Sequence, residues 1–373
     1  MNAREVRGVA VAAALFLLVQ VGAVAMVGPF ETAGYQAVED PSDPTNSLVY
    51  IAAILVATAL MLAAFKYAFE QAVKVVVVGS SALVSWYVFA VVAPPLLTVG
   101  SVNLVAIALA AGVAVALLLY PEWYVIDTAG VVMGIGAGAL FGISFGLLPA
   151  ILLLSVLAVY DAISVYGTEH MLSLAEGVMD LRVPVILVIP LSLSYSLLAD
   201  DFSGASGVHD DEATPESADT EVGDSDAGSA PTPAADGDGT DDTADGDGTD
   251  DTADGDGTDD TADRDGTDDT ADRDAFFIGL GDAVMPTVMV ASAAFFSPAR
   301  SLGVAVLPAL NLPALLSMAG TFLGLGILLW AVMKGRAHAG LPLLNGGAIG
   351  GYLLGSVLAG VSLVRALGLT PYL

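Results

Sequence analysis

The chain has 373 residues, of which 55% are hydrophobic, and its mean hydropathy is +0.76. A soluble domain is usually only about 45–50% apolar, so lipid must be the solvent for much of this surface. The absence of cysteine excludes disulfides, thiolate catalysis and cysteine metal sites. The three histidines are scattered and form no HExxH zinc pattern. We therefore expect an integral membrane protein without a metal or other cofactor.

The net charge of −30 is concentrated in one segment. Between Asp200 and Asp274 lie 28 of the 41 acidic residues and only two of the eleven basic ones. The rest of the chain is nearly neutral, with 13 acidic and nine basic residues. Few lysines and a surplus of aspartate are typical of organisms that live in high salt, so we expect a halophilic source. No nucleic-acid partner is expected.

Nine apolar stretches follow one another along the chain, each close to the roughly 20 residues that a helix needs to cross a bilayer. They are Val6–Val27, Leu48–Phe69, Val73–Ala93, Leu104–Tyr120, Tyr124–Phe145, Leu147–Gly167, Ala275–Phe296, Leu312–Met333 and Leu341–Val364. The first stretch is longer than the apolar core of a signal peptide, so a retained helix is expected. Ser301–Asn311 either extends the eighth span or forms a loop. We expect an all-α membrane protein with nine transmembrane helices.

These spans divide the chain into four parts. Residues 1–167 form a six-helix part and residues 275–373 a three-helix part. Between them, residues 168–199 form an interfacial or strand segment, and residues 200–274 an acidic loop. In the interfacial segment, His170–Leu181 is a candidate interfacial helix. Val183–Leu198 contains two prolines and three serines, so it suits an extended strand better than a tenth span.

The acidic loop carries a nine-residue repeat. TDDTADGDG begins at Thr240 and again at Thr249, and a variant and a partial copy follow at Thr258 and Thr267. Such a sequence buries almost no apolar area, so it is expected to stay disordered. Its alternating aspartates are similar to calcium-binding loops. A solvated acidic linker is the preferred interpretation, because no helix pattern flanks the repeats.

The basic residues predict the orientation, since they gather in cytoplasmic loops. With the N-terminus inside, only Arg300 and Arg365 lie outside. The inside segments hold Arg4, Arg7, Lys66, Lys74, Arg182, Arg264, Arg273, Lys334 and Arg336. We therefore expect a cytoplasmic N-terminus and, after nine crossings, an extracellular C-terminus in the cell membrane.

Two acidic residues lie clearly within predicted spans, Asp161 and Asp282. An ionisable group inside the bilayer is costly and usually functional. Asp161 lies six residues before the end of the sixth span and Asp282 about eight after Asp274, which is roughly 9 and 12 Å below the same face. By contrast, Glu122 and Asp127 begin the fifth span, where interfacial water is expected to solvate them.

Two carboxyls at one depth suit acid–base chemistry. One keeps its proton while the other takes a proton from an attacking water, and the two titrate as a unit. Gly279 and Gly281 flank Leu280 without side chains, so another backbone has room beside Asp282. Two stripes of glycines four residues apart predict close helix packing. They are Gly134, Gly138, Gly142 and Gly146, and Gly347, Gly351 and Gly355.

These residues resemble a known family. Tyr160-Asp161 in a sixth helix and Gly279-Leu280-Gly281-Asp282 in a seventh are similar to the YD and GxGD motifs of presenilins and signal peptide peptidases. The resemblance implies an intramembrane aspartic endopeptidase that uses Asp161 and Asp282 to cut single-span membrane proteins in the bilayer. It covers the nine-helix body and leaves out the acidic loop. Accessory subunits and a homo-oligomer stay open.

The family's third motif, Pro-Ala-Leu at the start of the ninth helix, corresponds here to Pro342, Leu343 and Leu344. Literal copies begin at Pro308, before the eighth span, and at Pro313, in its first turn, so neither lies at the start of the ninth span. A proline at a helix start leaves nearby backbone groups free to pair with an extended substrate. The resemblance also implies that the substrate is held as a strand, and Val183–Ile189 and Ala275–Ile278 are the candidate strands beside it.

Two other functions fit parts of the pattern. A preflagellin or prepilin peptidase shares GxGD chemistry, but it has fewer spans and lacks the YD helix. A proton-coupled transporter would use both aspartates as a relay and would be expected to show inverted repeats, and no half-to-half similarity is visible. The protease is the preferred interpretation.

Overall fold

The computed structural model describes residues 3–67, 69–100, 102–167, 184–190, 195–197, 275–334 and 339–372. All of them belong to one structural unit, Met1–Ser203 together with Thr267–Leu373. The predicted helix at His170–Leu181 and the acidic repeats lie outside the described residues.

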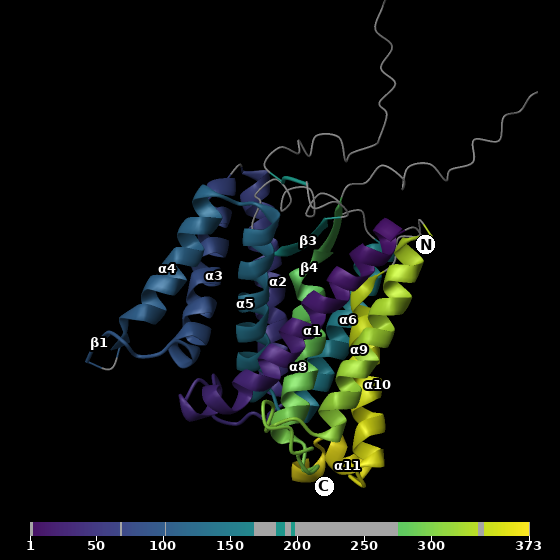
Figure 1. The fold of residues 1–373 in the computed structure, drawn as a ribbon. Coiled ribbons are helices and arrows are strands. Elements are labelled where there is room, and N and C mark those ends of the chain that lie inside the picture. The colour runs from purple at the N-terminus through teal and green to yellow at the C-terminus, as the bar shows by residue number, and fades with distance from the viewer. Residues whose placement is uncertain are drawn as a thin grey trace, which may run out of the picture. The chain divides into compact units, whose positions relative to one another are not determined.

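Long apolar helices dominate the described part of the chain (Figure 1). They are α1 (Ala3–Thr32), α2 (Thr45–Lys66), α3 (Glu70–Val92), α4 (Leu104–Leu119), α5 (Trp123–Ser144), α6 (Leu147–Gly167), α8 (Leu280–Phe296), α9 (Leu312–Val332) and α10 (Gly340–Leu358). Within these residues, seven helices are long and apolar enough to cross a membrane. The apolar helices α4 and α8 are shorter, with 16 and 17 residues. The helical membrane fold is confirmed, and the number of nine crossings stays a prediction.

Three predicted boundaries are wrong by five residues or more. The first helix, α1, continues to Thr32 rather than ending at Val27. The seventh stretch begins with a strand, so α8 starts at Leu280 rather than at Ala275. The last helix ends at Leu358, before the expected Val364. The cause of the early end is Gly360, which has φ +76°. The amide of Val361 then donates to the carbonyl of Ser356 at 2.9 Å, as in a Schellman cap. A short helix, α11 (Leu363–Ala366), and a final turn follow.

Ser301–Asn311 forms a loop, closed by an isolated bridge between its two end residues. Two small antiparallel sheets complete the described structure. The first is a hairpin of β1 (Thr98–Val99) and β2 (Val102–Asn103). The second pairs β3 (Ile186–Pro190) with β4 (Ala275–Gly279), and Ile186 lies opposite Gly279. The expected extended segments on either side of the acidic loop are therefore strands.

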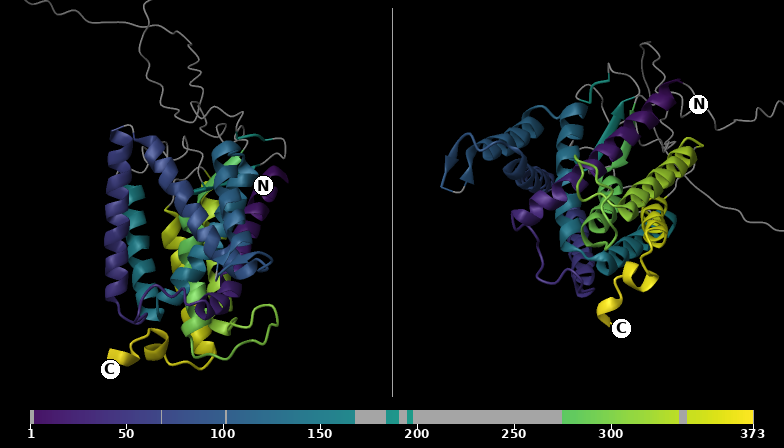
Figure 2. Two further views of the ribbon diagram at one scale, coloured as in Figure 1. Left: turned by 90° about the vertical axis from the view of Figure 1, so that its left-hand side faces the viewer. Right: turned by 60° about the horizontal axis from the view of Figure 1, so that its bottom comes forward.

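The sheet β3–β4 lies at the same end of the helices as the N-terminus, and the C-terminus lies at the other end (Figure 1). α2 lies at the periphery beside α6, whereas α8 is surrounded by α1, α5, α6, α9 and α10 (Figure 2). The central position of α8 explains why most of its side chains are buried.

Glycines allow the central helices to approach closely. On α5, Gly138 faces Thr287 of α8, and Gly142 faces Ala291 one turn further. On α10, Gly347 and Gly351 face backbone carbonyls of α9. Small residues at an interface are the usual means of helix association in lipid, where no hydrophobic effect drives it. The predicted packing role of both glycine stripes is confirmed.

The contact of Gly142 generates a first prediction. An alanine methyl there would overlap the Cβ of Ala291, so Gly142→Ala must push α5 and α8 apart at a cost of about 1–3 kcal/mol. We expect the thermal midpoint in detergent to fall by roughly 2–10 °C. Gly112→Ala on α4, where the added methyl meets nothing within 4 Å, is the matched control. Equal midpoints for the two variants would contradict the packing argument.

Candidate active site

Asp161 lies on α6, six residues before the helix ends at Gly167. Its side chain is only 8% exposed. The backbone amide of Leu341 donates to Asp161 Oδ2 at 3.0 Å, and the Gly340 amide also bonds to this carboxyl. Both donors belong to the first turn of α10, where backbone amides have no partner inside the helix. The start of α10 therefore supplies the hydrogen bonds that a carboxyl needs in an apolar surrounding.

Asp282 lies in the first turn of α8. The expected position, eight helical residues after Asp274, was wrong because β4 occupies residues 275–279. The chain approaches Asp282 as the extended strand β4, and α8 begins only two residues before the aspartate. Asp282 is therefore at a strand-to-helix junction rather than inside a continuous helix.

The first turn of α10 joins the two aspartates. Gly340, whose amide bonds to Asp161, also lies against Asp282, since a Cβ on Gly340 would be 3.3 Å from both carboxyl oxygens. The charge of Asp161 acts on the Asp282 carboxyl. Ala339, just before this turn, donates its amide to the Tyr166 hydroxyl on α6 at 3.4 Å. Three helices, α6, α8 and α10, thus meet at one pair of acids.

The other residues of the two acidic motifs lie in different surroundings. Tyr160 is 43% exposed and does not line the cavity described below. Gly279 does line it, and a Cβ there would lie 3.5 Å from Asp282 Oδ2. Leu280 is buried in the core and faces Gly130 and Gly134 of α5. A Cβ on Gly281 would meet nothing within 4 Å.

The expected third motif lies within the first turns of α10. Pro342 and Leu343 are half-buried, and Leu344 is fully buried in the core. The carbonyl of Leu343 packs against Gly324 of α9. The expectation that backbone groups beside the proline are free was wrong for the amides of Gly340 and Leu341, because both bond to Asp161.

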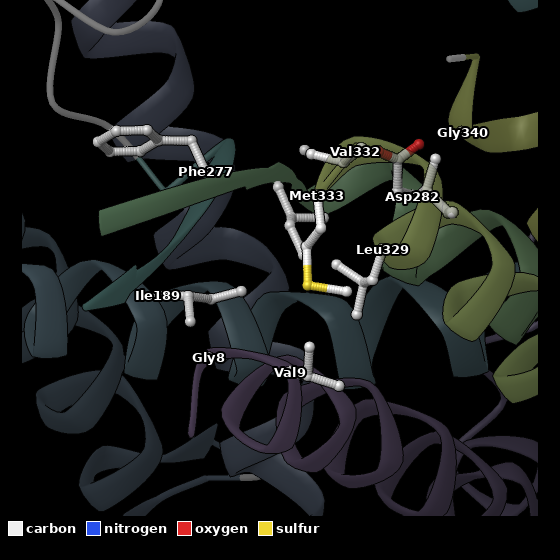
Figure 3. A pocket seen from close by; sticks show the side chains of 12 residues that line it. Gly8, Val9, Ile189, Phe277, Asp282, Leu329, Val332, Met333 and Gly340 are labelled. Atoms are coloured by element: carbon white, nitrogen blue, oxygen red, sulfur yellow. The ribbon is translucent and has the colours of Figure 1, made fainter. Parts of the chain in front are cut away.

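A cavity of about 200 Å³ opens beside Asp282. Its walls come from the start of α1, both strands of the sheet β3–β4, the end of α9 and the start of α10. Figure 3 shows the Asp282 carboxyl next to Gly340, and Met333 between Ile189 and Leu329. Apart from Asp282, the lining side chains are apolar. The cavity is smaller than the roughly 300–1,000 Å³ typical of ligand pockets, so its size suits single side chains.

Two acids at the start of α5 were misinterpreted from the sequence. Asp127 and Glu122 are 6% and 5% exposed rather than solvated. Asp127 Oδ1 accepts the Val188 amide of β3 at 2.7 Å. Glu122 accepts the Ser196 hydroxyl at 2.6 Å and the Leu197 amide at 3.0 Å. Both carboxyls therefore hydrogen-bond to the segment that follows α6. Nothing in the sequence around Glu122 and Asp127 indicates these partners, which are more than 60 residues away.

Asn345 is a further polar residue beside the site, and no motif in the sequence marks it. It is fully buried one turn after Leu341, and its Nδ2 donates to the Leu154 carbonyl of α6 at 3.1 Å. This bond joins α10 to α6 below Asp161. Among the described residues, no group of three histidine, cysteine, aspartate or glutamate side chains could hold a metal.

Comparison with known proteins decides the family. The sequence model described as "Signal-peptide peptidase, presenilin aspartyl protease" matches residues 13–224 and 252–361, which is most of the chain. This protein belongs to that family. It is therefore an intramembrane aspartic protease, and the transporter and prepilin-type alternatives are not supported.

Solved structures agree with the family assignment. A presenilin family intramembrane aspartate protease crystallised in space group C222 is 26% identical, with a TM-score of 0.55, and the match covers 94% of this chain and 99% of that one. A second structure of a presenilin family intramembrane aspartate protease, in space group P2, is also 26% identical, with a TM-score of 0.52 and coverage of 93% and 96%. No curated protein matches the sequence.

The contact between Gly340 and Asp282 generates a second prediction. The side chain of Gly340→Val would displace the Asp282 carboxyl or the start of α10, because even a Cβ lies 3.3 Å from both oxygens. Small misplacements of reacting groups cost up to about 100-fold in rate, so kcat/KM for a reporter transmembrane segment should fall roughly 10- to 100-fold. Initial rates with purified protein in detergent measure this.

The matched control for this variant is Gly346→Val. Gly346 lies on the same helix with open space around its Cα, so its variant should cleave the reporter at the rate of the unchanged protein. If both valine variants retained full activity, the first turn of α10 would have no part in the site.

Proposed function

We propose that Asp161 and Asp282 are the catalytic pair of this protease and hydrolyse peptide bonds within transmembrane helices of single-span proteins. One observation carries the proposal: the same turn of α10 contacts both carboxyls, through the Leu341 amide on Asp161 and through Gly340 beside Asp282. Acids on two separate helices thus lie at one position, in a part of the chain that is otherwise apolar.

The pair supplies both halves of acid–base catalysis. Two neighbouring carboxyls in a low dielectric do not both ionise readily, so they share one proton. The ionised carboxyl takes a proton from water as the water attacks the peptide carbonyl carbon, and the protonated carboxyl donates to the carbonyl oxygen. When the C–N bond breaks, a carboxyl returns a proton to the leaving amine. The two acids titrate as a unit, so the starting roles belong to the pair.

The surroundings of Asp282 support an extended substrate. A peptide carbonyl inside a helix is hidden by its hydrogen bonds and side chains, so the segment must unwind before water attacks it. The strand β4 leads directly into Asp282, and the apolar cavity lies between this strand and the end of α9. We propose that an unwound substrate segment lies along the sheet β3–β4 and places one apolar side chain in the cavity. Gly279 and Pro342–Leu344 border this path.

The basic residues predict which substrates are presented correctly. With the N-terminus of the protease in the cytoplasm, the catalytic pair lies nearer the cytoplasmic face. Substrates are then single-span helices whose N-terminus lies outside, such as the remnants left after release of an ectodomain. The sheet β3–β4 lies at the end of the bundle where the N-terminus of the chain lies (Figure 1), which agrees with this arrangement.

Removal of either acid tests the pair. Asp161→Asn and Asp282→Asn keep the shape of the side chain but cannot exchange a proton as an acid does, so each should lower reporter cleavage at least about 1,000-fold. Glu39→Ala, in the exposed loop after α1, is the control and should cleave normally. Mass spectrometry of the products in liposomes measures both. Unchanged cleavage in either aspartate variant, or aspartate-dependent solute flux without any product, would refute the proposal.

The absence of cysteine makes the orientation testable. A single cysteine at Ser301, in the loop between α8 and α9, should react with a membrane-impermeant maleimide added to intact cells, because this loop is expected outside. A single cysteine at Gln71, in the exposed first turn of α3, should react only after the membrane is opened. The reverse pattern would show that the N-terminus lies outside and would change the expected substrates.

A further inference from the structure

The buried carboxyl of Asp127 has no role in the proposed chemistry. It lies on α5, a helix that carries neither catalytic aspartate, and it is 6% exposed within an apolar span. A carboxyl is costly at such a position unless it is hydrogen-bonded. Its bond is to the backbone of β3, where Val188 donates to Oδ1 at 2.7 Å. The carboxyl thus connects α5 to the sheet that leads to Asp282.

The direction of this bond follows from the register of the sheet. Leu280 donates its amide to the Val185 carbonyl at 2.7 Å, which makes residues 185 and 280 a hydrogen-bonded pair. Hydrogen-bonded pairs alternate along an antiparallel ladder. Val188, opposite Phe277, therefore points its amide away from β4. Asp127 accepts this amide from the outer edge of β3, so a substrate strand cannot pair with β3 at this residue.

The packing of β3 on α5 supports the same connection independently. Gly130, one turn after Asp127, leaves room for the sheet, since a Cβ there would lie 3.0 Å from Leu187 Cδ2. Val188 packs in one cluster with Ile126 and Ala129 of α5, and Leu187 packs in the other cluster with Leu280. Glu122 holds Leu197, further along the same segment. One face of α5 is therefore a platform for the sheet.

We propose that Asp127 is a positioning residue, which fixes the sheet β3–β4 on α5 and thereby determines which peptide bond of the substrate reaches the catalytic pair. β3 is five residues long and β4 ends at Gly279, three residues before Asp282. A shift of this short sheet along α5 would move the substrate relative to the aspartates. This inference rests on the proposed path of the substrate along the sheet.

In this proposal Asp127 acts as a hydrogen-bond acceptor. Two substitutions at this position should therefore differ in effect, because only one of them keeps an acceptor. Asp127→Asn keeps an oxygen that accepts the Val188 amide, whereas Asp127→Ala leaves that amide without an acceptor in an apolar surrounding, which destabilises the local structure. With the full-length protein in liposomes, Asp127→Asn should cleave the reporter at the same peptide bonds and within about threefold of the normal kcat/KM.

Asp127→Ala should lower kcat/KM about tenfold or more and spread the product termini over neighbouring peptide bonds. Thr128→Ala is the matched control and should leave rate and termini unchanged. In the described part of the chain, the Thr128 hydroxyl bonds within its own helix, to the Tyr124 carbonyl. Hydrogen exchange of the segment around Val188 should increase in Asp127→Ala alone. A general loss of folding would lower the rate but would not redistribute the termini.

A steric variant keeps the test decisive if Asp127→Ala does not fold. Gly130→Ala leaves the acceptor in place but presses on Leu187, so it should also shift the product termini. Gly79→Ala on α3, where a methyl meets nothing within 4 Å, should not. Unchanged termini in both Asp127→Ala and Gly130→Ala, or a loss in Asp127→Asn as large as in Asp127→Ala, would overturn the inference.

The result is distinguishable from failure of the catalytic assignment. If Asp161→Asn or Asp282→Asn cleaved normally, the proposed pair would be wrong whatever the Asp127 variants did. If both aspartates were required and the termini of the Asp127 and Gly130 variants stayed in place, only the positioning function would be refuted.

Discussion

The hydrogen bond from the Leu341 amide to Asp161 is the interaction on which the arrangement of the site depends. A carboxyl inside an apolar helix bundle needs donors, and the described structure provides them from the start of another helix, where backbone amides are unused. The positive end of the α10 dipole faces the carboxyl at the same time. Gly340, the residue before Leu341, has no side chain, so the same turn of α10 also lies against Asp282.

This contact requires the helices that carry it to be held close together. α10 approaches α9 through Gly347 and Gly351, and its Asn345 donates to a carbonyl of α6. α8 approaches α5 through Gly142. In lipid such contacts depend on shape and hydrogen bonds rather than on exclusion of water. The glycine stripes and the buried polar side chains therefore determine where the two aspartates meet.

The sheet β3–β4 has an unusual place in this arrangement. A two-stranded sheet is barely stable alone, and backbone groups at membrane depth must be satisfied within the protein. α5 meets both needs. Leu187 and Val188 pack against it, and Asp127 accepts the Val188 amide, which has no partner in β4. The family of the chain, signal peptide peptidases and presenilins, indicates its chemistry. The support of the sheet by α5 is seen in the contacts of the folded chain.

The sequence by itself determined the membrane location, most helix positions, the two acids in neighbouring spans and the resemblance of their motifs to the family. Hydropathy and short motifs are local properties, so they can be recognised along the chain. Only the tertiary structure decided that α8 begins at Leu280, that the amide of Leu341 bonds to Asp161, and that Asp127 is buried against β3. The partners in these contacts are up to 180 residues apart. A position along a helix axis does not reveal which side chain faces lipid, water or another backbone, because distant segments create that surrounding only when the chain folds.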